Sequence, residues 1–138
     1  NYSLGSITKT FTGTMVMRAI EKGLIKLEDP VSKFFPNLVL ENPVLNSKKI
    51  TIRNLLSHTS GMPDLRYYHG GKYHNKSETG LPFDITYQIY PAGVHYRYSN
   101  HGFQLLGEIL KKVHNKNSLQ EIIQNELFKP IGMTDSVV

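Results

Sequence analysis

"GSITKTFTG", residues 5–13, places Ser6 three residues before Lys9, where a helical pattern of apolar residues begins. Apolar residues recur with helical spacing over residues 7–20, and Gly23 is a typical helix stop. We therefore expect a buried core helix of about 16 residues that opens at or next to Ser6. Because residues i and i+3 of a helix share a face, the Lys9 amine can reach the Ser6 hydroxyl.

The Ser6–Lys9 pair has two interpretations. A serine hydroxyl becomes a nucleophile when a base takes its proton, and the N–H groups at a helix N-terminus favour the negative charge that develops in acyl transfer. Lysine accepts a proton only when it is neutral, and burial or a second cation nearby favours this neutral form. If Lys9 stays charged, another group, such as a tyrosinate, would accept the Ser6 proton. Alternatively, Ser6 is a helix cap and Lys9 an exposed charge, since ten serines and twelve lysines give about one Ser-x-x-Lys by chance.

The composition fits one globular domain and excludes several kinds of site. The chain has 138 residues, of which 39% are hydrophobic and 20% are charged. The lack of cysteine excludes disulfides, thiol catalysis and cysteine–zinc sites. No apolar run approaches the roughly 18 residues of a membrane span. The net charge of +5 comes from scattered lysines and arginines, which we interpret as solvated surface rather than a nucleic-acid site.

The rest of the chain predicts mostly helices and loops. Three short helices are predicted from their capping residues: one from Asp29-Pro30 to before Pro36, one from Thr51 to about Ser57, and one from Ser118 to about Phe128. Residues 100–113 carry the second strong helical pattern, which stops at Asn115. Residues 59–97 form a long irregular stretch of a kind that is usually functional. Alternating residues predict a short strand at 94–98.

The tripeptide Tyr98-Ser99-Asn100 lies where this strand meets the helix of residues 100–113. A tyrosine can relay protons, and an asparagine two residues later can point into the same cleft. Tyr-x-Asn also occurs at Tyr73-His74-Asn75, but that loop is rich in lysine and has no apolar anchor, so the context favours Tyr98. Asn100 could also be a plain helix N-cap.

Four blocks occur in the order "GSITKTFTG", "LLSHTSGMP", "YSNHGFQLLGEIL" and "LFKPIGM". Together they resemble the serine β-lactamase-like family, which comprises class C β-lactamases, DD-peptidases and related esterases. The similarity extends over nearly the whole chain and is weakest between Arg66 and Tyr90. The resemblance implies a serine hydrolase that forms an acyl-enzyme from an amide, β-lactam or ester bond. It also implies a small-molecule or peptide substrate, no metal or cofactor, and export to the periplasm or cell surface.

The resemblance assigns a role to each matching residue. Ser6 would be the acylated nucleophile, and its backbone N–H would form half of the oxyanion hole. Lys9 would assist the deprotonation of Ser6. Tyr98 would relay protons during acylation and during water attack, and Asn100 would hold the substrate amide and help to orient Lys9. His58, within "LLSHTSG", would be a packed or capping histidine.

The resemblance also implies a mainly helical fragment of an α/β (α+β) fold, with most of the antiparallel sheet outside this chain. The family's third motif, Lys or His followed by any residue and Gly, has no match after Asn100. Residues 1–138 would then be a single partial β-lactamase-related domain, truncated at both ends, and inactive and poorly stable in isolation. Relatives usually have Pro-Gly where this chain has Pro91-Ala92-Gly93, so that loop would shift by one residue.

Three other functions compete with hydrolysis. A non-catalytic relative would use the same fold to bind peptide or cell-wall fragments. A metal site would draw on the six histidines, of which His69 and His74 share a loop, but no further ligand has suitable spacing. A helical nucleic-acid module would use the basic surplus, and its binding would depend steeply on salt. The sequence does not predict the substrate within the hydrolase class, nor the oligomeric state.

Overall fold

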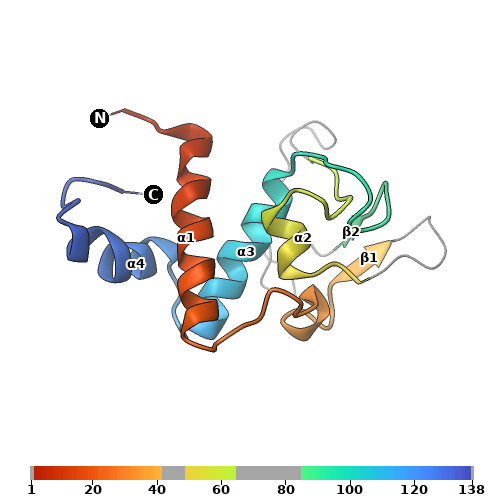
Figure 1. Cartoon of the computed structure of the whole chain (residues 1–138), viewed down its shortest axis with the longest axis horizontal. Coiled ribbons are helices and arrows are strands. Elements are labelled where there is room, and N and C mark those ends of the chain that lie inside the picture. The colour runs from red at the N-terminus through yellow and green to blue at the C-terminus, as the bar shows by residue number, and fades with distance from the viewer. Residues whose placement is uncertain (1, 42–48, 65–84, 138) are drawn as a thin grey trace. The chain divides into compact units, whose positions relative to one another are not determined.

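The computed structural model describes residues 2–41, 49–64 and 85–137, and the chain divides into two compact units. The terminal unit combines Asn1–Lys26 with Leu106–Val138, and the central unit is Leu27–Leu105. Figure 1 shows that the described part is mainly helical, as the sequence predicts.

The terminal unit consists of helices in its described residues. Its elements are the 3-10 helix η1 (Gly5–Ile7), α1 (Thr8–Glu21), the later part of α3 (Asn100–Val113), α4 (Leu119–Ile123), the π-helix η4 (Gln124–Phe128) and the 3-10 helix η5 (Lys129–Ile131). The predicted helix from Ser118 to about Phe128 is therefore present, but its second half is a π-helix. The Ser118 side chain caps α4 by accepting the N–H of Glu121 at 3.2 Å.

Helix α1 confirms the core helix that the sequence predicts, with one difference at its start. Met15, Val16 and Ala19 are fully buried, whereas Ile7 is 58% exposed. The chain enters α1 through the 3-10 turn of η1, so the predicted apolar face is buried only from the second turn onwards. Near the start of α1, the ring of Phe11 packs edge-on against the ring of Phe128, with a distance of 4.9 Å between the ring centroids.

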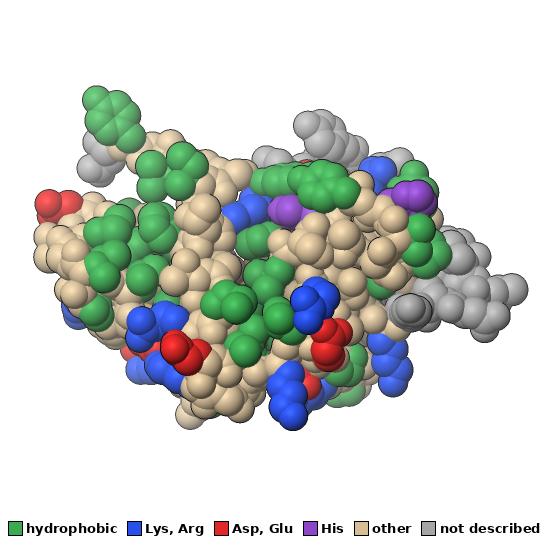
Figure 2. Space-filling view, viewed as in Figure 1, with side chains coloured by type: hydrophobic (Ala, Val, Ile, Leu, Met, Phe, Trp, Pro, Cys, Tyr) green, Lys and Arg blue, Asp and Glu red, His purple; other side chains and the backbone are tan. Residues whose placement is uncertain are grey.

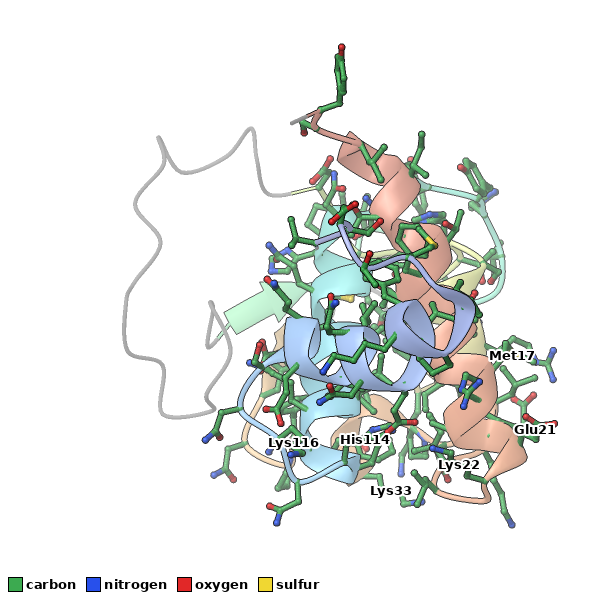
Figure 3. The ribbon with its side chains drawn as sticks, turned by 90° about the vertical axis from the view of Figure 1, so that its left-hand side faces the viewer. Met17, Glu21, Lys22, Lys33, His114 and Lys116 are labelled. Atoms are coloured by element: carbon green, nitrogen blue, oxygen red, sulfur yellow. The ribbon has the colours of Figure 1, made fainter. Side chains whose placement is uncertain are left out.

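A charged cluster joins the end of α1 to the later helices of the same unit. Lys22 donates to the carboxylate of Glu126, and the Nε2 atom of His114 lies 3.3 Å from that carboxylate (Figure 3). The hydrogen bond from Lys22 is the main reason that the pKa of Glu126 is lowered, since it stabilises the ionised form.

Glu126→Gln is expected to destabilise the full-length protein at pH 7 by about 0.5–1 kcal/mol. Because the pKa of Glu126 is lowered in the folded state, its contribution is present above its ordinary value of 4.5 and is lost as the pH falls below that value. Urea unfolding at pH 7 and pH 3.5 measures this difference. Glu121→Gln, which breaks an exposed ion pair with Lys116, is the matched control. An equal effect of Glu126→Gln at both pH values would contradict the prediction.

The central unit contains a small parallel strand pair and short helices. Its elements are the 3-10 helix η2 (Val31–Lys33), β1 (Val39–Glu41), α2 (Ile52–Leu56), β2 (Ile85–Tyr87) and the first residues of α3. Strands β1 and β2 pair in parallel, with Val39 opposite Ile85. The strand predicted at 94–98 is wrong, because those residues form no ladder. Their backbone is held instead by single bonds, such as the 2.7 Å bond from the Arg97 N–H to the His58 carbonyl.

Two predicted helix starts have different outcomes. Thr51 caps α2 through a reciprocal pair of bonds with Asn54, which confirms the prediction. The cap at Asp29 is wrong. Pro30 precedes η2 without any side-chain cap, because the Asp29 carboxylate binds the Lys33 ammonium group at 2.8 Å instead.

Gly61 brings two segments of the central unit into close contact. Its φ is +74°, and a Cβ atom at this position would lie 1.9 Å from the carbonyl oxygen of Tyr90. The Ile89 N–H donates to the Gly61 carbonyl at 2.8 Å. Only glycine fits this approach, because any side chain would collide with backbone. The segment 58–64 is thereby fixed against residues 88–93.

Hydrophobic side chains are exposed near both ends of the described chain. Figure 2 shows such side chains on the surface over α1 and α4. The most exposed hydrophobic residues near the two ends are Tyr2, Ile7, Ile131 and Val137, each at least 58% exposed. Among the described residues, no helix is long and apolar enough to cross a membrane.

Candidate active site

Ser6 and Lys9 lie together at the start of α1, within the terminal unit. The Lys9 Nζ atom donates to the Ser6 Oγ atom at 3.2 Å. Ser6 is exposed in η1, and Lys9 is half-buried in the first turn of α1. The helix N-cap is Ile7 and has no side-chain hydrogen bond, so the alternative that Ser6 caps the helix is wrong. A separation near 3 Å is what proton transfer between a nucleophile and its base requires.

The chain reaches Ser6 through a glycine turn. Gly5 has a φ of +53°, a left-handed conformation that glycine adopts at little cost. This turn starts η1 and places Ser6 just before the first residues of α1. The N-terminus of α1, a helix of 14 residues, carries the partial positive charge of aligned peptide dipoles. Negative charge that develops near Ser6 is therefore favoured.

Ser99, rather than Asn100, caps helix α3. Its Oγ atom accepts the N–H of Gly102 at 3.1 Å and donates to the Pro63 carbonyl at 3.3 Å. The alternative that Asn100 is the N-cap is therefore wrong. The Nδ2 atom of Asn100 instead donates to the Oδ2 atom of Asp64 at 2.8 Å. Because a carboxylate only accepts, this bond fixes which end of the Asn100 amide faces Asp64.

The ring of Tyr98 packs on the ring of His58. Their centroids are 4.5 Å apart, and the planes are tilted by 31°. The Nδ1 atom of His58 also accepts the backbone N–H of Ser99 at 3.2 Å. The prediction that His58 is a packed histidine is confirmed. The sequence did not predict the bond from Ser99 to His58 or the bond from Asn100 to Asp64, because these partners are separated by 41 and 36 residues in the chain.

His101, the residue after Asn100, is almost completely buried. Burial lowers the pKa of its imidazole from 6.5 to about 4, because the charged form loses its hydration, and the Asp64 carboxylate opposes this shift. His101 is therefore neutral at pH 7. The sequence carries no signal for this residue, which sits on the inner face of α3.

The stability of the full-length protein is expected to fall by up to about 3 kcal/mol as the pH drops from about 6.5 to about 4. In this range the unfolded chain protonates His101, while the folded protein does so only near its lowered pKa of about 4. His101→Phe should flatten this part of the stability profile in urea unfolding. His95→Phe, which changes an exposed histidine, is the control. Identical profiles for His101→Phe and the unchanged protein would contradict the prediction.

The structure thus holds the predicted residues in two groups, each within its own unit. Ser6 contacts Lys9, and residues 58–64 support Tyr98, Ser99 and Asn100. Within the described ranges, no three histidine or carboxylate side chains form a group that could hold a metal ion. The alternative Tyr73-His74-Asn75 and the histidine at 69 lie outside the described residues.

The sequence model of the beta-lactamase family matches residues 2–138. The chain belongs to the β-lactamase family. This confirms the resemblance carried by the four ordered blocks. The match includes the Ser6–Lys9 pair as well as residues 98–100.

This β-lactamase-family chain is similar to curated proteins and to solved structures. Protein flp of Staphylococcus aureus (strain NCTC 8325 / PS 47) is 33% identical over 96% of this chain and 27% of its own length. D-alanyl-D-alanine-carboxypeptidase/endopeptidase AmpH of Escherichia coli (strain K12) is 31% identical over 96% of this chain and 35% of its own length. The D-stereospecific amidohydrolase from Streptomyces sp. superposes with a TM-score of 0.74 and 30% identity, over 95% of this chain and 42% of that one.

Two conclusions follow from these matches. The described structure has the fold of part of a β-lactamase or penicillin-binding protein, and the family is one of hydrolases. The chain spans 27% and 35% of the two curated relatives.

Proposed function

We propose that the full-length protein is a serine hydrolase that cleaves an amide, β-lactam or ester bond through an acyl-enzyme on Ser6. The observation that carries this proposal is the 3.2 Å contact between Lys9 Nζ and Ser6 Oγ at the start of α1. A serine becomes nucleophilic when a base lies within hydrogen-bond reach. The family membership supports hydrolysis as the reaction class.

In the proposed acylation, Lys9 assists the transfer of the Ser6 hydroxyl proton while Oγ attacks the substrate carbonyl carbon. The resulting oxyanion is stabilised by the Ser6 backbone N–H and the N-terminus of α1. When the intermediate collapses, the amine or alkoxide leaves with a proton that Tyr98 relays. Water then attacks the ester carbonyl, Tyr98 receives its proton, and Ser6 regains its hydroxyl. Asn100 holds the substrate amide and helps to orient Lys9.

The proposed substrates are small molecules or peptides, and the reaction needs neither metal nor cofactor nor nucleic acid. Two of the relatives are named for the hydrolysis of D-alanyl-D-alanine and D-configured amides, which supports an amide substrate. Export to the periplasm or cell surface stays a prediction from the family resemblance.

We also propose that residues 1–138 form a single partial domain, truncated at both ends, with most of the antiparallel sheet outside it. The chain covers at most 42% of the compared proteins, which supports this proposal. The exposed apolar residues near both ends, such as Ile7 and Ile131, would then be covered by other segments of the full-length protein. The isolated chain would be inactive.

The proposal is tested by assaying the full-length protein against a chromogenic ester, a D-alanyl-D-alanine peptide and a chromogenic β-lactam. We expect turnover of at least one substrate, and time-dependent inactivation by a fluorophosphonate. A folded protein that turns over none of them, yet binds cell-wall peptide, would instead be the non-catalytic relative.

A further inference from the structure

We infer that His58 is a positioning residue for Tyr98: it fixes the Tyr98 phenol through its ring, its Nδ1 atom and its backbone carbonyl. This inference rests on the proposed function, in which Tyr98 relays protons. It goes beyond a packing role, because His58 contacts the Tyr98 ring and also binds the backbone of the residues before and after it.

His58 accepts two backbone hydrogen bonds, one from the residue before Tyr98 and one from the residue after it. The Arg97 N–H donates to the His58 carbonyl at 2.7 Å, and the Ser99 N–H donates to the His58 Nδ1 atom at 3.2 Å. The backbone is thus held immediately before and immediately after Tyr98. His58 makes both bonds from a left-handed conformation, with a φ of +55°. For a residue other than glycine, this conformation costs free energy, and it persists only where contacts with the surrounding structure offset that cost.

The ring of His58 then sets the direction of the Tyr98 side chain. The two rings pack at 4.5 Å, and the His58 ring also packs on Phe103 at 5.0 Å. Tyr96 meets the His58 ring edge-on at 5.9 Å. The phenol oxygen lies at the far end of the Tyr98 side chain, so a small rotation of the ring displaces it substantially. A displacement of about 1 Å at a reacting group can cost about 10²-fold in rate.

The neighbours of His58 in the chain hold the other residues of the tripeptide. The Pro63 carbonyl accepts from Ser99 Oγ at 3.3 Å, and Asp64 accepts from Asn100 Nδ2 at 2.8 Å. The segment 58–64 therefore supports residues 98, 99 and 100 in turn. Within this segment, the ring that packs on Tyr98 is that of His58, so we expect a change at His58 to affect the proton relay.

The test uses two variants of the full-length protein that separate the contacts of His58. His58→Asn keeps an acceptor near the position of Nδ1 and tolerates a positive φ, but it removes the ring. His58→Phe keeps the ring and removes the acceptor. Each variant is made in the unchanged protein and in Tyr98→Phe, which loses only the phenol oxygen. The rate of acylation by a fluorophosphonate or penicillin probe is measured by intact mass, and thermal melts confirm folding.

We expect each His58 variant to slow acylation by about 10-fold or more in the unchanged protein, and by less than about 3-fold in Tyr98→Phe. His95→Asn, at an exposed histidine that packs on Tyr90, should leave the rate unchanged. Equal losses in both backgrounds would show that His58 is only structural, and unchanged rates in both variants would also overturn the inference. Full activity of Tyr98→Phe would overturn the role of Tyr98 and the inference with it. Acylation that persists in Ser6→Ala would overturn the proposed function itself, and this result is distinct from those that test His58.

Discussion

Replacing Ser6 with alanine in the full-length protein is expected to lower kcat/KM by about 10⁴-fold or more. The change removes the one oxygen that can form the ester, while the rest of the site stays in place. Alanine fits the exposed position in η1 without strain, so folding should be unaffected. Steady-state hydrolysis of the best substrate from the proposed panel measures the loss.

Ser3→Ala is the matched control for this prediction. Ser3 is also exposed and lies three residues earlier in the chain, but no lysine follows it at the third position. Its replacement should change kcat/KM by less than about twofold. If Ser6→Ala kept most of its activity, another residue would be the nucleophile, and the proposed function would be wrong.

Replacing Lys9 with methionine is expected to slow acylation by about 10²–10⁴-fold, the usual contribution of a general base. Methionine keeps most of the length and the apolar stem of lysine, so the half-buried side chain can still pack. It lacks the amine that lies 3.2 Å from Ser6 Oγ. Single-turnover acylation, followed by intact mass, measures this step without interference from hydrolysis of the ester.

Lys49→Met is the control, since Lys49 is an exposed lysine of the central unit. It should leave the acylation rate unchanged. A normal rate for Lys9→Met would assign the proton transfer to a different group, of which a tyrosinate at Tyr98 is the first to test. The combination Lys9→Met with Tyr98→Phe would then decide between the two acceptors.

The helices that could be predicted from the sequence are those whose signals are local and strong. Residues 7–20 and 100–113 repeat their apolar residues with helical spacing, and α1 and α3 form there. The caps at Thr51 and Ser118 bond to an N–H three residues later. Such bonds depend only on nearby residues, which is why their patterns were sufficient.

Other elements depend on residues that are distant in the sequence. The parallel pairing of β1 with β2 joins segments more than 40 residues apart. Alternation at 94–98 predicted a strand, but a strand needs a partner, and the described backbone bonds of this stretch go to single residues: the Arg97 N–H donates to the His58 carbonyl and the Val94 N–H to the Pro91 carbonyl. The failed cap at Asp29 has a local cause instead, because its carboxylate binds Lys33 four residues later. At 94–98 and at Asp29, other contacts thus replaced the predicted ones.

In the candidate site too, the sequence predicted local contacts but not those between distant residues. The Ser6–Lys9 contact spans three residues of one helix start, so spacing alone predicted it. Tyr98 and Asn100 were chosen by context and by the family resemblance. The support that His58 and Asp64 give them comes from about 40 residues earlier in the chain, and no local pattern predicts which side chains would meet.

Acyl-enzyme formation on Ser6 is best tested by the intact mass of the full-length protein before and after a fluorophosphonate or penicillin probe. The adduct is then located by peptide mapping, with Ser6→Ala treated in parallel. We expect one adduct per chain, on the peptide that contains Ser6, and none in Ser6→Ala. An adduct on another peptide, or one that persists in Ser6→Ala, would contradict it.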